Sequence, residues 1–133
     1  MEESDWRRPI SGIPYSIDDD ILQLTMPPNA TAAAFEATVQ RVLIDPRFRQ
    51  GMGILCDRRG APPPTPGYLE AVIAITRRYA DLLGRSRWAV LVREDDGETF
   101  GTFRNIAPLV EKFAEPWSFT DRDEALQWLR PSS

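Results

Sequence analysis

The sequence predicts an α/β domain with a mixed, mainly parallel sheet of about five strands that is covered by helices. Two short runs, Met52–Cys56 and Trp88–Val92, are apolar at almost every position. A run that is apolar on both faces suits a strand buried between helices, as strands of parallel sheets are. Helical patterns separate the strand candidates, giving the order β-β-α-β-α-β-α-β-α, which is typical of a parallel sheet with right-handed crossovers.

The chain is expected to fold as one domain behind an N-terminal arm. Residues 1–14 contain two prolines and little periodicity, so we expect a loose arm there, which Trp6 and Ile10 could pin to the domain. Residues 15–133 contain no repeat, linker or low-complexity segment beyond one proline-rich loop. A chain of 133 residues can bury about two-thirds of its unfolded surface, which is enough for a single core.

A β-hairpin should open the sheet. Tyr15–Ile17 and Ile21–Met26 have the composition of strands, and they flank the aspartates Asp18–Asp20, which favour a turn. A tight turn makes the two strands antiparallel neighbours. We therefore expect one antiparallel edge on an otherwise parallel sheet.

The first helix should span Thr31–Ile44 and lead into the strand Met52–Cys56. Its apolar residues recur at helical spacing, and Asn29 or Thr31 is suited to cap its N-terminus. The residue before a proline avoids the α conformation, so the helix should end before Pro46. The strand is then the central one of the sheet, and its Cys56 should be buried and slow to react with thiol reagents.

Two further helices are expected after the central strand. Thr65 and Pro66 suit the N-cap and the first helical position of one, and Gly84 is a natural residue to end it. A second helical pattern runs from about Glu98 to Ala114, and Pro108 must kink or split it.

The chain should end in a short strand and a last helix. Trp117–Phe119 is the strand candidate. Thr120–Asp123 has the form of a capping box, with aspartate in the place of the usual glutamate or glutamine, and it leads into a helix over Asp123–Arg130.

The composition excludes several classes of function. The net charge is −4 and the isoelectric point is about 4.9, whereas domains that bind nucleic acid carry a basic stripe, so we expect no nucleic-acid partner. Cys56 is the only cysteine and there is no histidine, which removes internal disulfides, thiolate–imidazole metal sites and the commonest catalytic base. We expect no metal, no cofactor and no enzymatic activity.

The chain also lacks the marks of a membrane or secreted protein. No apolar run approaches the ~20 residues that cross a bilayer. The first residues are acidic, unlike the start of a signal peptide. These features predict a cytoplasmic protein without a transmembrane segment.

Four phrases carry a resemblance to a known family. They are Ile44–Arg49, Gly53–Ala61, Trp88–Val92 and Phe119–Leu129. With the order of elements, they resemble the STAS/SpoIIAA-like domain over about residues 15–130, and in particular its STAS/SEC14-like branch. The resemblance implies the SpoIIAA-like fold and a non-catalytic regulatory or protein-interaction module. In the anti-sigma-factor antagonists of that family, a serine at the start of the helix after the central strand is phosphorylated.

The residue in this position here is Thr65, which the resemblance marks as a candidate phospho-acceptor. It stands before Pro66 and Gly67, and the Asp-Ser-Ser-Gly phrase of the family is missing. The alternative is that Thr65 only caps its helix. The resemblance to the SEC14-like branch, with the phenylalanine and tryptophan content, also favours a second function, the binding of a small apolar or lipid-like ligand. A homodimer remains open.

The loop from Arg58 to Tyr68 is the expected partner surface. It joins the central strand to a helix, which is where functional surface gathers in α/β proteins, and its prolines offer a preformed surface at a low ordering cost. The candidate binding residues for a partner or an anion are Asp57, Arg58, Arg59, Thr65 and Tyr68.

The paired arginines could hold a phosphate or a carboxylate beside a helix N-terminus. The alternative is a pair of solvated side chains, with Asp57 fixing the loop through backbone N–H groups. If Arg58 and Arg59 both lie on the surface, replacing both by alanine should change stability by no more than about 0.5 kcal/mol.

Overall fold

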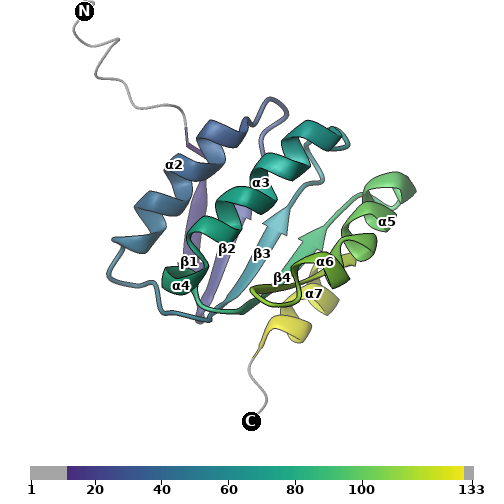
Figure 1. Ribbon diagram of the computed structural model, residues 1–133. Helices are drawn as coiled ribbons and strands as arrows, with labels where there is room; N and C mark the ends of the chain where they lie inside the picture. Colours follow the sequence, from purple (N-terminus) through teal and green to yellow (C-terminus); the bar gives the residue numbers. More distant parts are fainter. Residues whose placement is uncertain (1–11, 131–133) are drawn as a thin grey trace, which may run out of the picture.

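Five strands form one mixed sheet in the order in which they occur along the chain (Figure 1). The computed structural model describes residues 12–130, so Trp6, Ile10 and the rest of residues 1–11 of the expected arm lie outside the described residues. The strands are β1 (Tyr15–Asp18), β2 (Ile21–Thr25), β3 (Gly53–Asp57), β4 (Ser86–Leu91) and β5 (Ala114–Phe119). β1 is antiparallel to β2 and every other pair is parallel. The predicted fold class is confirmed, with β3 in the middle and β4 beside it.

Helices cover the sheet unequally. They are α2 (Ala32–Leu43), α3 (Pro66–Arg78), α4 (Ala80–Leu83), α5 (Gly97–Asn105), α6 (Ala107–Val110) and α7 (Arg122–Leu129). The strand order never reverses, so successive right-handed crossovers place α2, α3, α5 and α6 on the same face. Figure 1 shows these helices in front of the sheet, with α7 behind it. Within residues 12–130, no helix is both long and apolar enough to cross a bilayer.

Alternate residues of β3 pack into two separate apolar clusters. Ile54 and Cys56 join the cluster that contains Phe35 of α2, whereas Leu55 joins the cluster that contains Ala125 of α7. Successive side chains of a strand point to opposite faces, so an apolar run of this kind is needed where both faces are covered. This is the physical reason why the pattern predicted a central strand.

Local signals set the starts of the elements. Asp19 and Asp20 have positive φ angles of 53° and 63°, as the turn of a tight hairpin requires. Thr31, rather than Asn29, caps α2, with its hydroxyl accepting from the Ala34 N–H at 3.1 Å. The predicted cap at Thr65 is confirmed, since its hydroxyl accepts from the Tyr68 N–H at 3.1 Å.

Several predicted boundaries need correction. The helix that opens at Pro66 breaks at Tyr79 before the short α4, and Gly84 follows α4 as predicted. The last helix is capped by Asp121, which accepts from the Asp123 N–H, and not by Thr120. The N-cap is therefore one residue later than the capping-box pattern implied, and α7 begins at Arg122.

The helix predicted over Glu98–Ala114 is also shorter than expected. It divides into α5 and α6 near Pro108, as predicted, but it ends at Val110, and Ala114 is the first residue of β5. β5 therefore begins three residues before the predicted start at Trp117. Ala114 follows Val110 at helical spacing, which extended the predicted helix, and Pro116 is tolerated within β5 because β5 is an edge strand.

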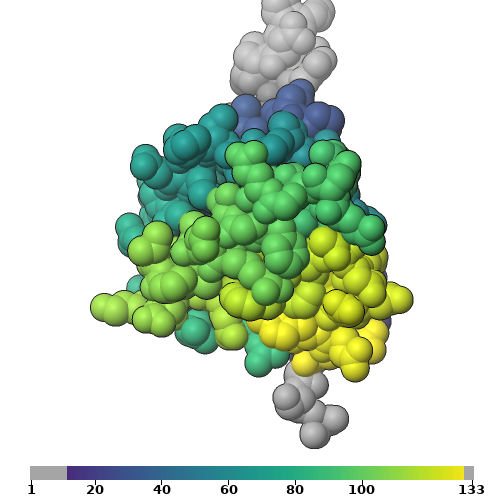
Figure 2. Space-filling model, turned by 90° about the vertical axis from the view of Figure 1, so that its right-hand side faces the viewer, coloured from purple at the N-terminus to yellow at the C-terminus, as the bar shows by residue number. Residues whose placement is uncertain are grey.

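The free edge of β5 is blocked in two places, by a proline of the strand itself and by an arginine of α5. The Phe119 carbonyl accepts from the Val92 N–H. The backbone N–H and C=O groups of the odd-numbered residues of β5 therefore face β4, whereas those of the even-numbered residues face the free edge. Pro116 has no N–H to offer at this edge, and the Ser118 carbonyl accepts from Arg104 Nη2 of α5 at 3.1 Å. Figure 2 shows this side of the molecule, which is formed mainly by the light-green residues around α5 and α6 and by the yellow α7.

Candidate binding site

A pocket lies between the N-termini of two neighbouring helices, at the carboxyl edge of the parallel strands. The connections from β2 to α2 and from β3 to α3 leave adjacent strands at the same edge and enter helices on the same face. Both helix N-termini therefore border one space, whose volume is about 410 Å³. The sequence placed functional surface at this edge, and the loop Arg58–Tyr68 forms one wall of the pocket.

The walls of the pocket are small and largely apolar. Two connections supply five prolines, and the remaining lining consists of alanine, threonine and glycine with Arg58 and Tyr68. The residues are Pro27, Pro28, Ala30, Thr31, Ala32, Arg58, Ala61, Pro62, Pro63, Pro64, Thr65, Gly67, Tyr68 and Ala71. Arg58 is the only charged residue among them, so the part of the lining that the structure describes contains one cation and no carboxylate.

Arg58 is buried, which corrects the expectation that both arginines lie on the surface. Its exposed fraction is 7%. The guanidinium carbon lies 5.7 Å from the centre of the Tyr68 ring and 5.8 Å from that of Phe103, distances at which cations are attracted to aromatic faces. Nη2 donates to the Pro62 carbonyl at 3.0 Å, which also holds the start of the proline-rich segment.

Arg59 and Asp57 pair with each other outside the pocket. The Asp57 carboxylate accepts from Arg59 Nε at 3.0 Å and from Nη2 at 2.9 Å, and it also accepts from the Arg59 backbone N–H at 3.0 Å. Burial raises the pKa of Asp57, but the hydrogen bonds from Arg59 outweigh it and hold the pKa below its usual range. Asp57 therefore fixes the loop, as the alternative interpretation held, and the two arginines do not act together.

A signal in the sequence could have separated the two arginines. Asp57 is the last residue of β3, and the alternation of the strand continues into the following residues. Arg58 shares the parity of Ile54 and Cys56, which pack toward α2, whereas Arg59 shares the parity of Asp57. Strand periodicity thus predicts that Arg58 points under the helices and that Arg59 points away.

Thr65 and Tyr68 complete the site at the first turn of α3. Thr65 is exposed, and its hydroxyl oxygen already caps the helix. Burial raises the pKa of Tyr68, whose hydroxyl lies 3.9 Å from Met26 Sδ and has no stronger acceptor among the described residues. The structure brings Arg58, Thr65 and Tyr68 together around the pocket and leaves Asp57 and Arg59 at its outer side.

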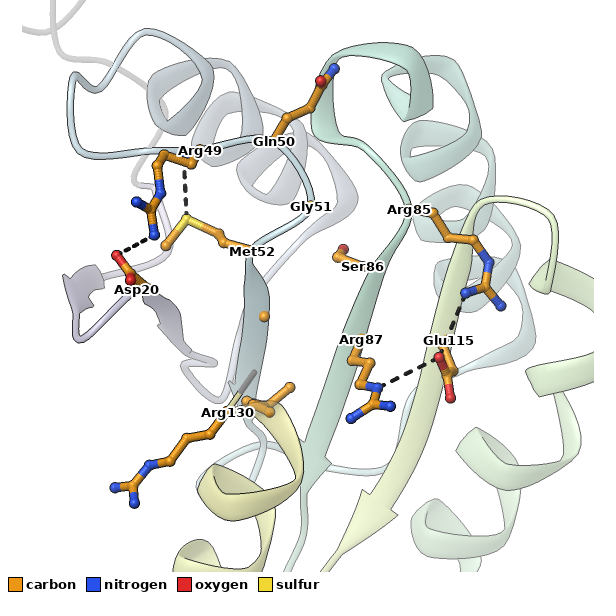
Figure 3. A pocket seen from close by; sticks show the side chains of 12 residues that line it. Asp20, Arg49, Gln50, Gly51, Met52, Arg85, Ser86, Arg87, Glu115 and Arg130 are labelled. Carbon is orange, nitrogen blue, oxygen red and sulfur yellow. Dashed lines mark hydrogen bonds and ion pairs between the residues drawn. The ribbon is translucent and has the colours of Figure 1, made fainter. Parts of the chain in front are cut away.

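A second hollow, of about 500 Å³, lies at the opposite edge of the sheet (Figure 3). Four arginines line it, namely Arg49, Arg85, Arg87 and Arg130. Arg49 pairs with Asp20, while Arg85 and Arg87 both approach Glu115, at 3.6 and 3.7 Å. Figure 3 shows Arg130 pointing away from these pairs. Three of the four cations therefore lie next to partly exposed carboxylates, and two of them share a single one.

The sequence interpretation missed this second hollow. Its arginines precede or begin the parallel strands β3 and β4, or end α7, and the amino ends of parallel strands meet at one edge. The recurrence of arginine just before buried runs was the available signal. These are partly exposed ion pairs, which contribute about 0–1 kcal/mol each and hold no buried group in place.

An apolar groove between α3 and the helices α5 and α6 is much smaller. Side chains from both sides, including Val72, Phe103 and Val110, meet over Trp88 and leave about 60 Å³. Sites for small organic ligands usually measure about 300–1,000 Å³. The groove is a seam in the packing rather than a preformed cavity.

The buried thiol of Cys56 leads to the first expected result. Burial raises the pKa of Cys56 to about 11, which leaves less than about 1% thiolate at pH 8. Labelling with a thiol reagent in the absence of denaturant should therefore be at least about 100-fold slower than in denaturant, because the thiolate is the reactive species. Equal rates in the two conditions would contradict the packed position of Cys56 in β3.

The chain was also compared with known proteins. A scan against protein-family models and a search of curated proteins both gave no match.

Proposed function

We propose that the chain is a non-catalytic, regulatory protein-interaction module of the STAS/SpoIIAA-like type, and that its partner surface is the loop Arg58–Tyr68 with the pocket behind it. The observation that carries the proposal is the pocket between the N-termini of α2 and α3, which lies where the resemblance places the regulatory surface. The family assignment itself rests on the resemblance of the sequence.

The pocket has the properties of an anchor site for a partner side chain. Its volume of about 410 Å³ suits one or two large side chains, and buried side chains that fill such pockets dominate the energy of protein interfaces. Prolines restrict the loop before binding, so little conformational entropy is lost when a partner docks. A guanidinium held against two aromatic rings supplies a fixed polar contact at the base.

The chemistry of the pocket supports binding more than catalysis. Its titratable lining groups are Arg58 and Tyr68, and burial raises the pKa of Tyr68 further above neutrality. General acid–base catalysis works best with a group that titrates near the operating pH. Tyr68 does not meet this condition.

The alternative function, binding of a small apolar or lipid-like ligand, receives less support. The apolar groove beside α3 leaves about 60 Å³, so a lipid tail would require α3 and α5 to move apart. Thr65 as a phospho-acceptor stays a prediction. Its exposed hydroxyl is at a helix N-terminus, where a phosphate would be stabilised.

Two glycines provide a matched test of the partner surface. Gly67 lies in the first turn of α3 at the pocket and Gly97 lies in the first turn of α5, away from it, and an added Cβ at either position meets nothing within 4 Å. Peptides from a random displayed library should be selected on the wild-type protein. Gly67→Trp should lower the affinity for the selected peptides by about tenfold or more, because the indole fills the pocket mouth. Gly97→Trp should retain binding.

Thermal melts of both variants serve as the folding control. Both should melt within a few degrees of wild type, since both glycines are exposed and an added Cβ at either position meets nothing within 4 Å. Selected peptides that bind Gly67→Trp as well as wild type would show that the partner surface lies elsewhere.

A further inference from the structure

We infer that the pocket between α2 and α3 receives a carboxylate carried on an apolar stem, and that Arg58 is the cation that binds it. The inference rests on the proposed function for the source of this group, which would be an acidic side chain or the chain end of a partner peptide. The charges and hydrogen bonds of the described residues define the site itself.

Arg58 is a buried cation whose hydrogen bonds are incomplete. Its Nε is fully covered and has no acceptor, and Nη2 donates only to the Pro62 carbonyl. Within residues 12–130 no geometrically well-formed hydrogen bond of Nη1 is found, although the guanidinium also lies beside the Tyr68 hydroxyl, where a hydrogen bond from it partly offsets the rise that burial causes in the pKa of Tyr68, and Arg58 lines the pocket. The N–H groups of Arg58 that Pro62 does not occupy are therefore the donors that we expect an occupant of the pocket to use.

No carboxylate of the described chain neutralises this charge. Every other arginine that lies close to an acidic side chain does so on the surface, and among residues 12–130 no carboxylate oxygen lies within 4.0 Å of an Arg58 nitrogen. Arg58 does lower the pKa of the carboxyl group of Asp96, the cap of α5, but it is the smallest of the causes that shift this pKa. Buried arginines are normally paired, so the missing anion points to a ligand.

The two helix N-termini add to the positive potential. α2 has 12 residues and α3 has 13, and each directs the positive end of its dipole and the free N–H groups of its first turn toward the pocket. Gly67 N–H belongs to this set, because an N–H in the first helical turn has no acceptor within the helix. An anion in the pocket would meet a guanidinium and two helix ends at once.

The walls decide which anion fits. A single guanidinium matches the single charge of a carboxylate. A phosphate dianion would keep a net negative charge and leave oxygens against proline and alanine, where they lack donors. The same walls favour the binding of an apolar stem, because alanine and proline surface is removed from water when the stem enters.

The requirements of the fold do not explain a cation at this position. A long apolar side chain would fill the space between Tyr68 and Phe103 without the cost of burying a charge, and such replacements of buried ions are often neutral or stabilising. The arginine hollow at the other edge is a weaker candidate. Its cations are largely exposed and three of them are already paired.

The test uses small probes, so it does not require the partner. Hexanoate, 1-hexanol, hexylammonium and inorganic phosphate should be titrated into isotopically labelled full-length protein, with the backbone amides of Gly67, Tyr68 and Thr31 as reporters. Hexanoate should shift these amides saturably and bind at least about tenfold more tightly than the alcohol, which is the factor that a hydrogen bond to a charged group provides. Hexylammonium and phosphate should bind more weakly than hexanoate.

Arg58→Met and Arg59→Met form the matched pair of variants. Both remove one positive charge from adjacent positions, but only Arg58 lines the pocket. Arg58→Met should lower the affinity for hexanoate by about tenfold or more while the melting temperature stays within about 4 °C of wild type. Arg59→Met should change the affinity less than about twofold. If Arg58→Met does not fold, Gly67→Trp, which blocks the pocket mouth, should abolish the same shifts.

The inference is overturned if hexanoate and hexanol bind equally, or if the shifts centre on residues of the arginine hollow such as Arg87. Failure of the two proposals can be told apart. Hexanoate binding without any selected peptide would leave the anion site and remove the partner surface. Peptide binding that neither hexanoate nor the Arg58→Met substitution weakens would leave the partner surface and remove the anion site.

Discussion

Replacing Phe35 by alanine is expected to lower the free energy of unfolding by about 3–5 kcal/mol. Phe35 is 1% exposed, and its ring lies 6.3 Å from that of Trp88 on β4, so it joins α2 to the sheet on the face that carries most of the helices. Removal of the ring deletes apolar burial and leaves a cavity that a close-packed core fills only in part. Urea unfolding followed by circular dichroism, with a check that the slope is unchanged, measures the effect.

Leu109→Ala is the control for this prediction. Leu109 is a large apolar residue on α6, but it is 72% exposed, so its loss should change stability by no more than about 0.5 kcal/mol. Similar losses for the two variants would mean that α2 does not pack on the sheet as described.

A second large loss is expected for Gly84→Ala, at about 2–4 kcal/mol. Gly84 has φ 76° and ψ 158°, a region that only glycine occupies readily, and strain of this kind costs about 1–3 kcal/mol. An added Cβ would also stand 2.7 Å from the Gly51 backbone nitrogen, which donates to the Leu83 carbonyl at 2.8 Å. The methyl group would push apart the two connections that lead into β3 and β4.

The same substitution at Gly101 should have the opposite sign. Gly101 lies inside α5, has no positive φ, and an added Cβ there meets nothing within 4 Å. Alanine restricts the unfolded chain and favours the helix, so Gly101→Ala should stabilise the protein by about 0.5–1 kcal/mol. Urea unfolding of the two variants side by side separates a conformational requirement at Gly84 from a general effect of alanine. Equal effects at both positions would contradict the strained geometry of Gly84.

The sequence was most informative where one residue property decided the structure. The apolar runs of β3 and β4 predicted central strands, because polar side chains are costly to bury in a strand that is covered on both faces. Thr65-Pro66 located the start of α3 because a cap and a missing N–H are both local requirements. These features depend on neighbouring residues in the chain, so they are readable without the fold.

Features that depend on the neighbouring strand or on direction were harder to predict. Ala114 was assigned to a helix because it continues the helical spacing of Val110, whereas it begins β5, an edge strand in which Pro116 interrupts no pairing with β4. Arg58 and Arg59 are the same type of residue. Their side chains leave the end of the strand on opposite faces, so one is a buried cation and the other belongs to a surface ion pair. The pocket itself arises from two connections about 30 residues apart, whose proximity follows from the strand order.

The closed edge of β5 has a consequence for the protein in a crowded solution. A neighbouring molecule that tried to continue the sheet would find no donor at Pro116, and at Ser118 it would find a carbonyl already occupied by Arg104. Unprotected edge strands are the usual starting points of intermolecular sheets and of fibrous aggregates. Arg104 and Pro116 therefore act as a barrier to polymerisation on this side, and an association of two copies through β5 would first have to displace an arginine that is stacked 4.0 Å from Trp117.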